Sequence, residues 1–214
     1  GGSAQIHKVA TLRSTSMRDI LLDGLPVLDL LEITASTSVV AALTNCDQSS
    51  VSRLHRRVSD QLGLDFRKTN GQYRAHANHA VLASLRQASQ LLRLGRGRLQ
   101  WQLRGTPKSI QALQSMGGRT LELVRERVLD LAVVNGLDTL PPGWEDSSKP
   151  FAFCDLVAIG LVRYPIQPSG RGTNLDAVVL RQEHLERPAV QALISQIRAV
   201  YLREYGQVPE LAWL

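Results

Sequence analysis

Residues 47–66, "DQSSVSRLHRRVSDQLGLDF", contain the segment that decides the fold of the first half of the chain. Four apolar residues recur within it at intervals of three, four and four, which is the spacing of one buried stripe on an α-helix. These four residues are Val51, Leu54, Val58 and Leu62. Asp47 can cap the start of this helix with its carboxylate, and Gly63 is well placed to end it. The pattern therefore predicts one amphipathic helix with defined ends.

The opposite face of the predicted helix carries amides, hydroxyls and guanidinium groups, whereas Glu and Lys usually cover a solvated helix. Its outward residues are Gln48, Ser49, Ser52, Arg53 and Arg56. Gln can pair with adenine, Arg with guanine, and Ser with either base or phosphate. The first turn of a recognition helix is the part that usually meets base edges. Further basic side chains are predicted to contact phosphates; this set is Arg56, Arg57, Arg67, Lys68 and Arg74.

The segments around this helix predict a small domain. Short helices are expected over residues 25–33 and 39–43, the second with Ser36 or Ser38 as its N-cap. After the third helix, Asn70-Gly71 stands between two short strand candidates, and this dipeptide favours the positive φ angles of a tight hairpin turn. Three helices followed by a hairpin make a winged helix-turn-helix.

A further helix is predicted over residues 77–94. Its apolar residues repeat at intervals of four, three and four, and they are Val81, Leu85, Ala88 and Leu92. Because a single helix beside a small domain cannot bury such a stripe alone, we expect a partner helix from a second copy of the chain. The alternative is that the stripe packs within its own chain. The following "GRGR" at 95–98 is expected to be a flexible, basic hinge.

Charge is distributed unevenly along the 214 residues. Residues 1–98 hold 13 Lys and Arg against 7 Asp and Glu, whereas residues 99–214 hold 12 against 12, so the first half carries the whole net charge of +6. A generally basic protein would spread its charge over both halves. The asymmetry indicates a module that binds a polyanion such as nucleic acid, followed by a neutral module.

The second half alternates strand and helix patterns. Strands are predicted at 99–104, 120–124, 129–134 and 151–162, and helices at 107–116 and 188–205. Such alternation indicates a small α/β domain with a largely parallel sheet. The predicted organisation is an N-terminal extension (1–24), a winged helix-turn-helix domain (25–75), a linker or dimerisation helix with hinge (76–98), and a shortened α/β domain (99–214).

The stretch "SVVAALTNCDQSSVSRLHRRVSDQLGLDF" resembles the N-terminal domain of LysR-type transcriptional regulators. The matching residues are Ser38, Ala41, Ala42, Leu43, Gln48, Val51, Ser52, Leu62, Gly63 and Phe66. The resemblance covers about residues 25–94. It implies that the helix 77–94 is the dimerising linker helix, and that the DNA-contacting positions are Gln48, Ser49, Ser52 and Arg53.

The second half is similar to the effector domain of the same family in pieces only. "GRLQWQL" resembles its first strand, "LVRERVLDLAVV" its helix-then-strand segment, and "PFAFCDLVAIGLV" the strand that crosses towards a second lobe. Since almost nothing remains between Val162 and Ala177 for a second lobe, the resemblance implies a truncated periplasmic-binding-like domain. The chain also departs from the family pattern at Asp47, where a serine is usual.

Other chemistries find little support in the sequence. His76 and His79 have helical spacing but lack a third metal ligand nearby, so we expect no metal site. Cys46 is interpreted as a small buried turn residue, with a redox switch as the alternative. The "SGRGT" at 169–173 lacks the ending of a phosphate loop. No nucleophile elbow or poised base marks an enzyme, no cofactor is expected, and no apolar run reaches the length of a membrane span.

These observations predict a sequence-specific regulator of transcription that binds double-stranded DNA as a homodimer or higher homo-oligomer. Contact with another protein through residues 99–214 is a further expectation, and so is a cytoplasmic location on the nucleoid. The alternative is a protein-interaction adaptor that keeps the winged-helix fold and binds DNA weakly, without specificity.

Overall fold

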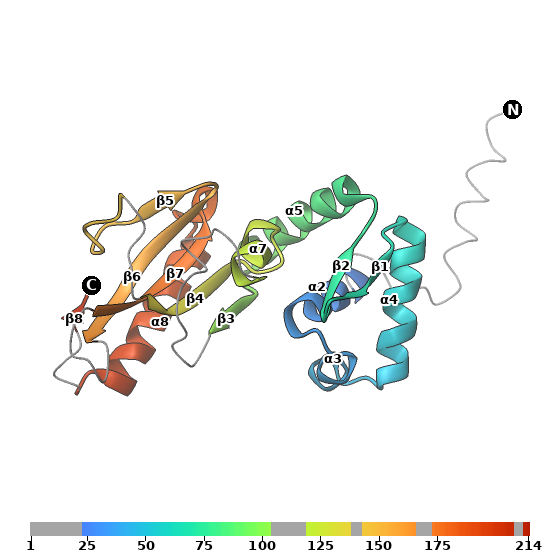
Figure 1. The fold of residues 1–214 in the computed structure, drawn as a ribbon, viewed down its shortest axis with the longest axis horizontal. Helices are drawn as coiled ribbons and strands as arrows, with labels where there is room; N and C mark the ends of the chain where they lie inside the picture. The colour runs from blue at the N-terminus through green and yellow to red at the C-terminus, as the bar shows by residue number, and fades with distance from the viewer. Residues whose placement is uncertain (1–22, 104–118, 138–142, 166–172, 208–211) are drawn as a thin grey trace, which may run out of the picture. The chain divides into compact units, whose positions relative to one another are not determined.

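The computed structural model describes residues 23–103, 119–137, 143–165, 173–207 and 212–214 (Figure 1). The chain divides into two compact units, Gly1–His79 and Ala80–Leu214, which are called here the first and the second unit. Residues 1–22 of the predicted extension (1–24) and the predicted helix at 107–116 lie outside the described residues. The predicted domain boundaries stay predictions.

The first unit contains three helices followed by a two-stranded hairpin, in the order that the sequence predicts. The helices are α2 (Leu25–Thr34), α3 (Thr37–Thr44) and α4 (Gln48–Leu62), and the strands are β1 (Phe66–Thr69) and β2 (Gln72–Ala75). The strands pair antiparallel, with Thr69 opposite Gln72. Asn70 and Gly71 form the turn with φ angles of 51° and 77°, which confirms the predicted hairpin.

The ends of α3 and α4 follow from their capping residues. Ser36 caps α3 because its Oγ accepts a hydrogen bond from the backbone N–H of Val39 at 3.2 Å. Asp47 caps α4 in the same way, accepting from the N–H of Ser50 at 2.7 Å. Gly63 ends α4 with a left-handed φ of 64°, a conformation that glycine adopts without strain.

The core of the first unit forms where α4 packs against α2 and α3. Three of the four predicted stripe residues, Val51, Leu54 and Val58, are buried, and Leu62 at the end of the helix is half-buried. They join apolar side chains of α2 and α3, among them Leu25, Leu28, Leu31 and Val40. Burial of this stripe fixes which face of α4 remains exposed.

The second unit is a helix followed by a six-stranded sheet with helices. Its elements are α5 (His79–Arg96), β3 (Trp101–Leu103), α7 (Arg119–Arg125), β4 (Leu131–Leu137), β5 (Phe151–Phe153), β6 (Leu156–Pro165), β7 (Thr173–Arg181), the 3₁₀ turn η2 (Gln182–His184), α8 (Pro188–Tyr205) and β8 (Ala212–Trp213). The strand order is β3-β4-β7-β6-β5, and β8 pairs with β6.

The expectation of a largely parallel sheet is wrong. Among the strands that the structure describes, only the β3–β4 pair is parallel; the pairs β4–β7, β7–β6, β6–β5 and β6–β8 are antiparallel. The reason lies in the connections: β6 and β7 pair up to Pro165 opposite Thr173, with only residues 166–172 between them, and a parallel pair needs a longer crossover. The chain therefore turns back after β6 and pairs with it again as β7. The crossing towards a second lobe that the resemblance implied for residues 151–162 does not occur.

Two predicted strands differ from the structure. Residues 120–124 belong to the helix α7, where Thr120, Leu121, Leu123 and Val124 are buried. A short apolar run cannot be assigned to helix or strand from its period alone, which explains this error. Residues 151–162 form two strands, β5 and β6, joined by a turn in which Cys154 has a φ of 50°.

Helix α8 covers one face of the sheet, and its bounds confirm the predicted helix 188–205. Its buried residues Val190, Ile194, Ile197 and Tyr201 share one apolar cluster with residues of β4, β6 and β7. Val200 lies on the other side of the helix and is 40% exposed. Trp101 on the edge strand β3 is 44% exposed.

Candidate nucleic-acid interface

The predicted DNA-reading residues lie together on the uncovered face of α4. Gln48, Ser49, Arg53, Arg56 and Arg57 are exposed, and Ser52 is half-buried. Ser49, Arg53 and Arg56 lie opposite the buried stripe, because residues three and four apart return to the same side of a helix, and Gln48, Ser52 and Arg57 flank them. None of these side chains is needed for the core, so the face is available for contact with another molecule.

A hydrogen-bond network orders the first turn of this face around Asp47. The Oδ1 atom of Asp47 accepts from the hydroxyl of Ser49 at 2.5 Å, and its Oδ2 accepts from the hydroxyl of Ser50 at 2.8 Å. Arg53 in turn donates through Nη2 to the Ser50 Oγ at 3.2 Å. Hydrogen bonds from Ser49 and Ser50 hold the pKa of Asp47 far below its usual range, so the carboxylate is an anion at neutral pH.

Two other predicted contact residues are bonded within the first unit. The Nε2 of Gln48 donates to the Oγ1 of Thr37 at 2.7 Å, which joins the first turns of α3 and α4. The ammonium of Lys68 donates to the carbonyl of Ala35 at 2.7 Å and lies 5.7 Å from the ring centre of Tyr73. Both contacts are exposed, so these side chains can exchange a partner inside the protein for one on DNA.

The remaining basic residues lie on the hairpin. Arg67 forms an ion pair with Asp65 at 3.1 Å, and more than half of each side chain is exposed. Exposed pairs of this kind contribute little to stability, roughly 0–1 kcal/mol, so a phosphate can replace the aspartate at small cost. Arg74 on β2 donates to the side-chain oxygen of Gln72 at 2.8 Å and is half-buried.

Thr37 is a residue of this face that the sequence reasoning missed. Its hydroxyl accepts the hydrogen bond from Gln48 and thereby sets the orientation of that amide. The signal was present in the sequence, because Ser36, Thr37 and Ser38 place three hydroxyl groups at the start of α3. A contact between residues 11 apart depends on how two helices pack, and helical periodicity does not encode this.

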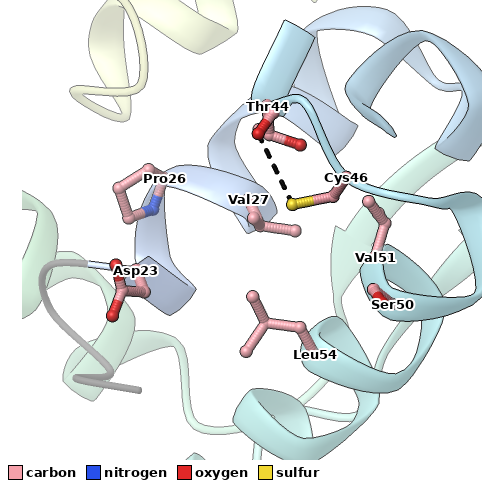
Figure 2. Close-up of a pocket in the computed structure, with 8 residues that line it drawn as sticks. All are labelled: Asp23, Pro26, Val27, Thr44, Cys46, Ser50, Val51 and Leu54. Carbon is pink, nitrogen blue, oxygen red and sulfur yellow. Dashed lines mark hydrogen bonds between the residues drawn. The ribbon is translucent and has the colours of Figure 1, made fainter. Parts of the chain in front are cut away.

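A hollow of about 390 Å³ lies on another side of the first unit (Figure 2). It is lined by Asp23, Pro26, Val27, Thr44, Cys46, Ser50, Val51 and Leu54. Val51 and Leu54 belong to the buried stripe of α4, so the hollow lies on the stripe side of the helix, and Ser50 connects it to the first turn of the exposed polar face. Cys46 is half-buried and its thiol donates to the carbonyl of Thr44 at 3.4 Å, which fits the interpretation as a turn residue.

The predicted dimerisation residues lie on the exposed side of α5. Val81 and Leu92 are 37% and 50% exposed, Ala88 is exposed and Leu85 is half-buried. The residues that α5 buries within the second unit are different ones, namely Leu82, Arg86, Gln90 and Leu94. The predicted stripe is therefore not used for packing within its own chain over the described residues, and dimerisation through it stays a prediction.

Among the described residues, no three His, Cys, Asp or Glu side chains come together as metal ligands. The helices of the same part of the chain are too short or too polar to cross a bilayer.

No family model matches the sequence, and no curated protein matches it either. The chain is similar to several solved structures. A full-length OxyR variant from Pseudomonas aeruginosa is 12% identical, with 85% of this chain and 98% of that chain covered and a TM-score of 0.43. An OxyR mutant from Corynebacterium glutamicum is 10% identical, with 89% and 94% covered and a TM-score of 0.37.

CrgA, a LysR-type transcriptional regulator from Neisseria meningitidis, is 11% identical, with 86% and 99% covered and a TM-score of 0.34. Identities and TM-scores at this level do not show that two chains share the same overall fold.

Proposed function

We propose that this protein is a LysR-like transcription regulator that binds double-stranded DNA with sequence specificity as a dimer. In this proposal, α2, α3, α4 and the hairpin β1–β2 form a winged helix-turn-helix, and α4 enters the major groove. The observation that carries the proposal is the exposed polar face of α4, which combines an amide, hydroxyls and guanidinium groups on a helix whose other face is buried.

The side chains of this face can contact both base edges in the DNA groove and phosphates of the DNA backbone. Arg53, with its guanidinium held towards the first turn by Ser50, can pair with the O6 and N7 atoms of guanine. Gln48 can pair with adenine once it leaves Thr37. Arg56 and Arg57 further along the helix are placed for phosphates, and so are the basic residues of the hairpin, which would act as the wing.

A dimer would supply the second reading helix. The exposed stripe of α5 offers an apolar surface of the kind that pairs two helices, and two copies related by a twofold axis would read two half-sites. The remainder of the second unit would then serve assembly or contact with another protein.

The test is a fluorescence anisotropy titration with a DNA site selected by the wild-type protein. Arg53→Ala and Gln48→Ala are expected to weaken binding by about 1–3 kcal/mol each and to relax the preference at one base pair. Arg125→Ala is the matched control, because it removes one exposed positive charge from the second unit. Unchanged affinity and unchanged preference in both reading-face variants would contradict the proposal.

A second measurement separates phosphate contacts from base contacts. The affinity of the wild-type protein is expected to fall steeply as salt rises, since bound cations are released from DNA when Lys and Arg neutralise phosphates. Arg57→Ala is expected to reduce the slope of log affinity against log salt by about one. A slope near zero for the wild type would contradict binding through phosphates.

The second candidate function is a protein-interaction adaptor with a winged-helix fold. It is favoured by the anionic Asp47 at the start of the proposed reading helix, because a carboxylate repels phosphates. In the same titration an adaptor would bind DNA weakly, with equal affinity for selected and scrambled sites. This outcome would replace the first proposal.

A further inference from the structure

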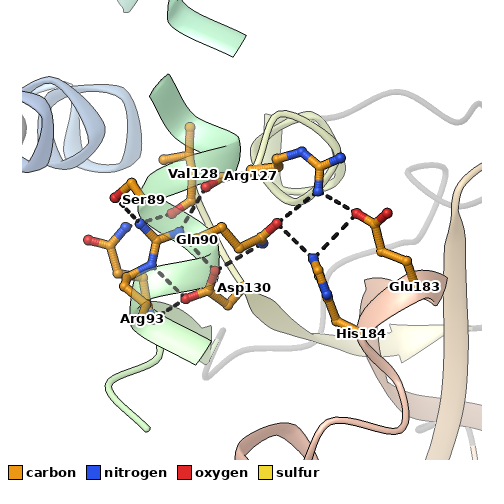
Figure 3. Close-up of polar contacts among 9 residues, drawn as sticks. Ser89, Gln90, Arg93, Arg127, Val128, Asp130, Glu183 and His184 are labelled. Carbon is orange, nitrogen blue, oxygen red and sulfur yellow. Dashed lines mark hydrogen bonds and ion pairs between the residues drawn. The ribbon is translucent and has the colours of Figure 1, made fainter. Parts of the chain in front are cut away.

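A buried polar cluster in the second unit ties α5 to the sheet (Figure 3). At its centre, the side-chain amide of Gln90 donates through Nε2 to Asp130 Oδ1 at 3.0 Å. The Gln90 Oε1 accepts from Arg127 Nη1 at 2.9 Å and lies 3.0 Å from His184 Nε2. Gln90 is 1% exposed, so these contacts replace all contact with water.

The neighbours of Gln90 determine which nitrogen of His184 carries the proton. Since the Nε2 of Gln90 faces the Asp130 carboxylate, its Oε1 must face the histidine, and a carbonyl oxygen can only accept. The neutral imidazole therefore carries its proton on Nε2. His184 is 5% exposed, and its Nδ1 is buried without a hydrogen-bond partner in the described part of the chain.

A second proton on His184 is unfavourable for two reasons. It would place a donor at Nδ1, where no acceptor lies among the described residues, and leaving a buried donor unpaired is costly. It would also add a positive charge beside three basic residues, Arg127 after α7, Arg181 on β7 and Arg187 before α8.

One acidic neighbour opposes this repulsion. The Oε1 of Glu183 lies 3.3 Å from His184 Nε2, but it also accepts hydrogen bonds from Arg127 and Arg181. These two contacts, of which the one with Arg127 has the larger effect, lower the pKa of Glu183 to about 2. The charge of Glu183 is therefore constant over the range in which His184 titrates. Burial lowers the pKa of His184 more than Glu183 raises it.

The charges beyond Gln90 are paired. On α5, Arg93 binds the Asp130 carboxylate with two hydrogen bonds of 2.8 Å. Two turns earlier, Arg86 lies 3.9 Å from Glu126, which follows α7. Histidine is the side-chain type whose charge changes between pH 5 and 8, and His184 is the histidine of this cluster.

We propose that His184 is a proton-sensitive latch that holds α5 on the sheet. While the imidazole is neutral, it completes the hydrogen bonds of Gln90. When it binds a second proton, the ring must leave its buried position to satisfy Nδ1, and Gln90 then loses a donor. The buried face of α5 is loosened as the pH falls. The latch itself does not involve DNA. Its effect on the two α4 helices of a dimer rests on the proposed function.

The test is hydrogen–deuterium exchange of the α5 amides in the full chain between pH 7.5 and 5.5, corrected for intrinsic exchange rates. In the wild type, we expect protection of the segment 82–94 to fall by about fivefold or more towards pH 5.5. His184→Gln is expected to be independent of pH, because its amide can still donate to Gln90 without titrating. His79→Gln, an exposed histidine on the same helix, is the control and is expected to behave as the wild type.

Equal pH dependence in the wild type and in His184→Gln would overturn the latch. If His184→Gln does not fold, nitrogen-15 spectra of the wild-type histidines replace it. The loss of protection in α5 is then expected to begin near pH 6.5, the ordinary pKa of a released imidazole, and to continue down to the pH at which His184 becomes the imidazolium. A loss of protection outside this range would also overturn the latch. Because neither readout uses DNA, failure of the latch and failure of DNA binding are separate results.

Discussion

Asp130 is the residue whose replacement tests the packing of α5 most strongly. Its side chain is 1% exposed, and its two oxygens accept four hydrogen bonds. Two come from Arg93, one from Gln90 and one from the backbone N–H of Gln100. An Asp130→Asn change keeps the size of the side chain, but it removes the charge and turns one acceptor into a donor that faces other donors.

The expected cost follows from burial. Breaking a buried ion pair by removing one partner costs about 3–5 kcal/mol, because the remaining charge stays buried without compensation. The Arg93 side chain is only 14% exposed, so water cannot replace the lost carboxylate fully. With an m-value of about 2 kcal/mol/M, a loss of this size lowers the urea midpoint by roughly 2 M.

The assay is urea unfolding followed by tryptophan fluorescence. All tryptophans lie in the second unit, at Trp101, Trp144 and Trp213, so the signal reports that unit alone. Trp144 is 2% exposed and stacks on Phe151 at 5.5 Å, so its emission is expected to shift on unfolding. Asp155→Asn is the matched control, since it changes an exposed aspartate in the turn between β5 and β6.

The effects of changing Arg93 and Asp130 are also expected to be coupled. The double variant Arg93→Gln/Asp130→Asn is expected to lose less free energy of unfolding than the two single variants together. The reason is that the double variant retains neither charge of the pair, so no unpaired charge is left. A midpoint for Asp130→Asn within 0.5 M of the wild type, or strict additivity of the two costs, would refute this account of the cluster.

Three further predictions concern other parts of the chain. Leu92→Glu is expected to shift the protein from dimer to monomer in sedimentation experiments, whereas Leu202→Glu, equally exposed at 50%, is not. Gly71→Val is expected to cost about 1–2 kcal/mol and to raise amide exchange in β1 and β2, because its φ of 77° is left-handed. Burial, and after it the nearby charge of Arg56, lowers the pKa of His55. The contribution of His55 to the stability of the first unit is therefore complete above pH 6.5, and it is lost as the pH falls through the lowered pKa. Exchange of the α4 amides measures this loss, and His55→Phe is expected to remove it.

The elements that were predictable from the sequence are those with local signals. Helix α4 has four periodic apolar residues, a capping Asp47 and a terminating Gly63, and each of these acts within a few residues of the chain. The hairpin turn is similarly local, because Asn70 and Gly71 tolerate positive φ angles. Such signals determine where an element begins and ends without knowledge of its partners.

The sheet of the second unit could not be predicted in the same way. Its strand directions depend on which distant strands pair, and the pattern of apolar residues is the same for parallel and antiparallel neighbours when both faces are covered. The polar cluster on α5 escaped prediction for another reason. Gln90 and Arg86 are polar residues that the structure buries, whereas a periodicity argument assigns polar residues to the exposed face.

The residue types of the candidate site and their exposure could be predicted from the sequence, but the hydrogen bonds that these residues make could not. The sequence placed Gln48 and Lys68 among the DNA-binding residues, and both are exposed. Their hydrogen bonds to Thr37 and Ala35 depend on the packing of α3 against its neighbours, which the sequence pattern does not contain.

The central claim is that the exposed face of α4 reads base pairs. Selection of DNA from a random pool by the wild-type protein tests it most directly. We predict enrichment of two symmetric half-sites about one helical turn, roughly 10 base pairs, apart. The same selection with Arg53→Ala is predicted to lose the preference at one base pair in each half-site. A pool that stays random after repeated rounds with the wild-type protein would contradict the claim.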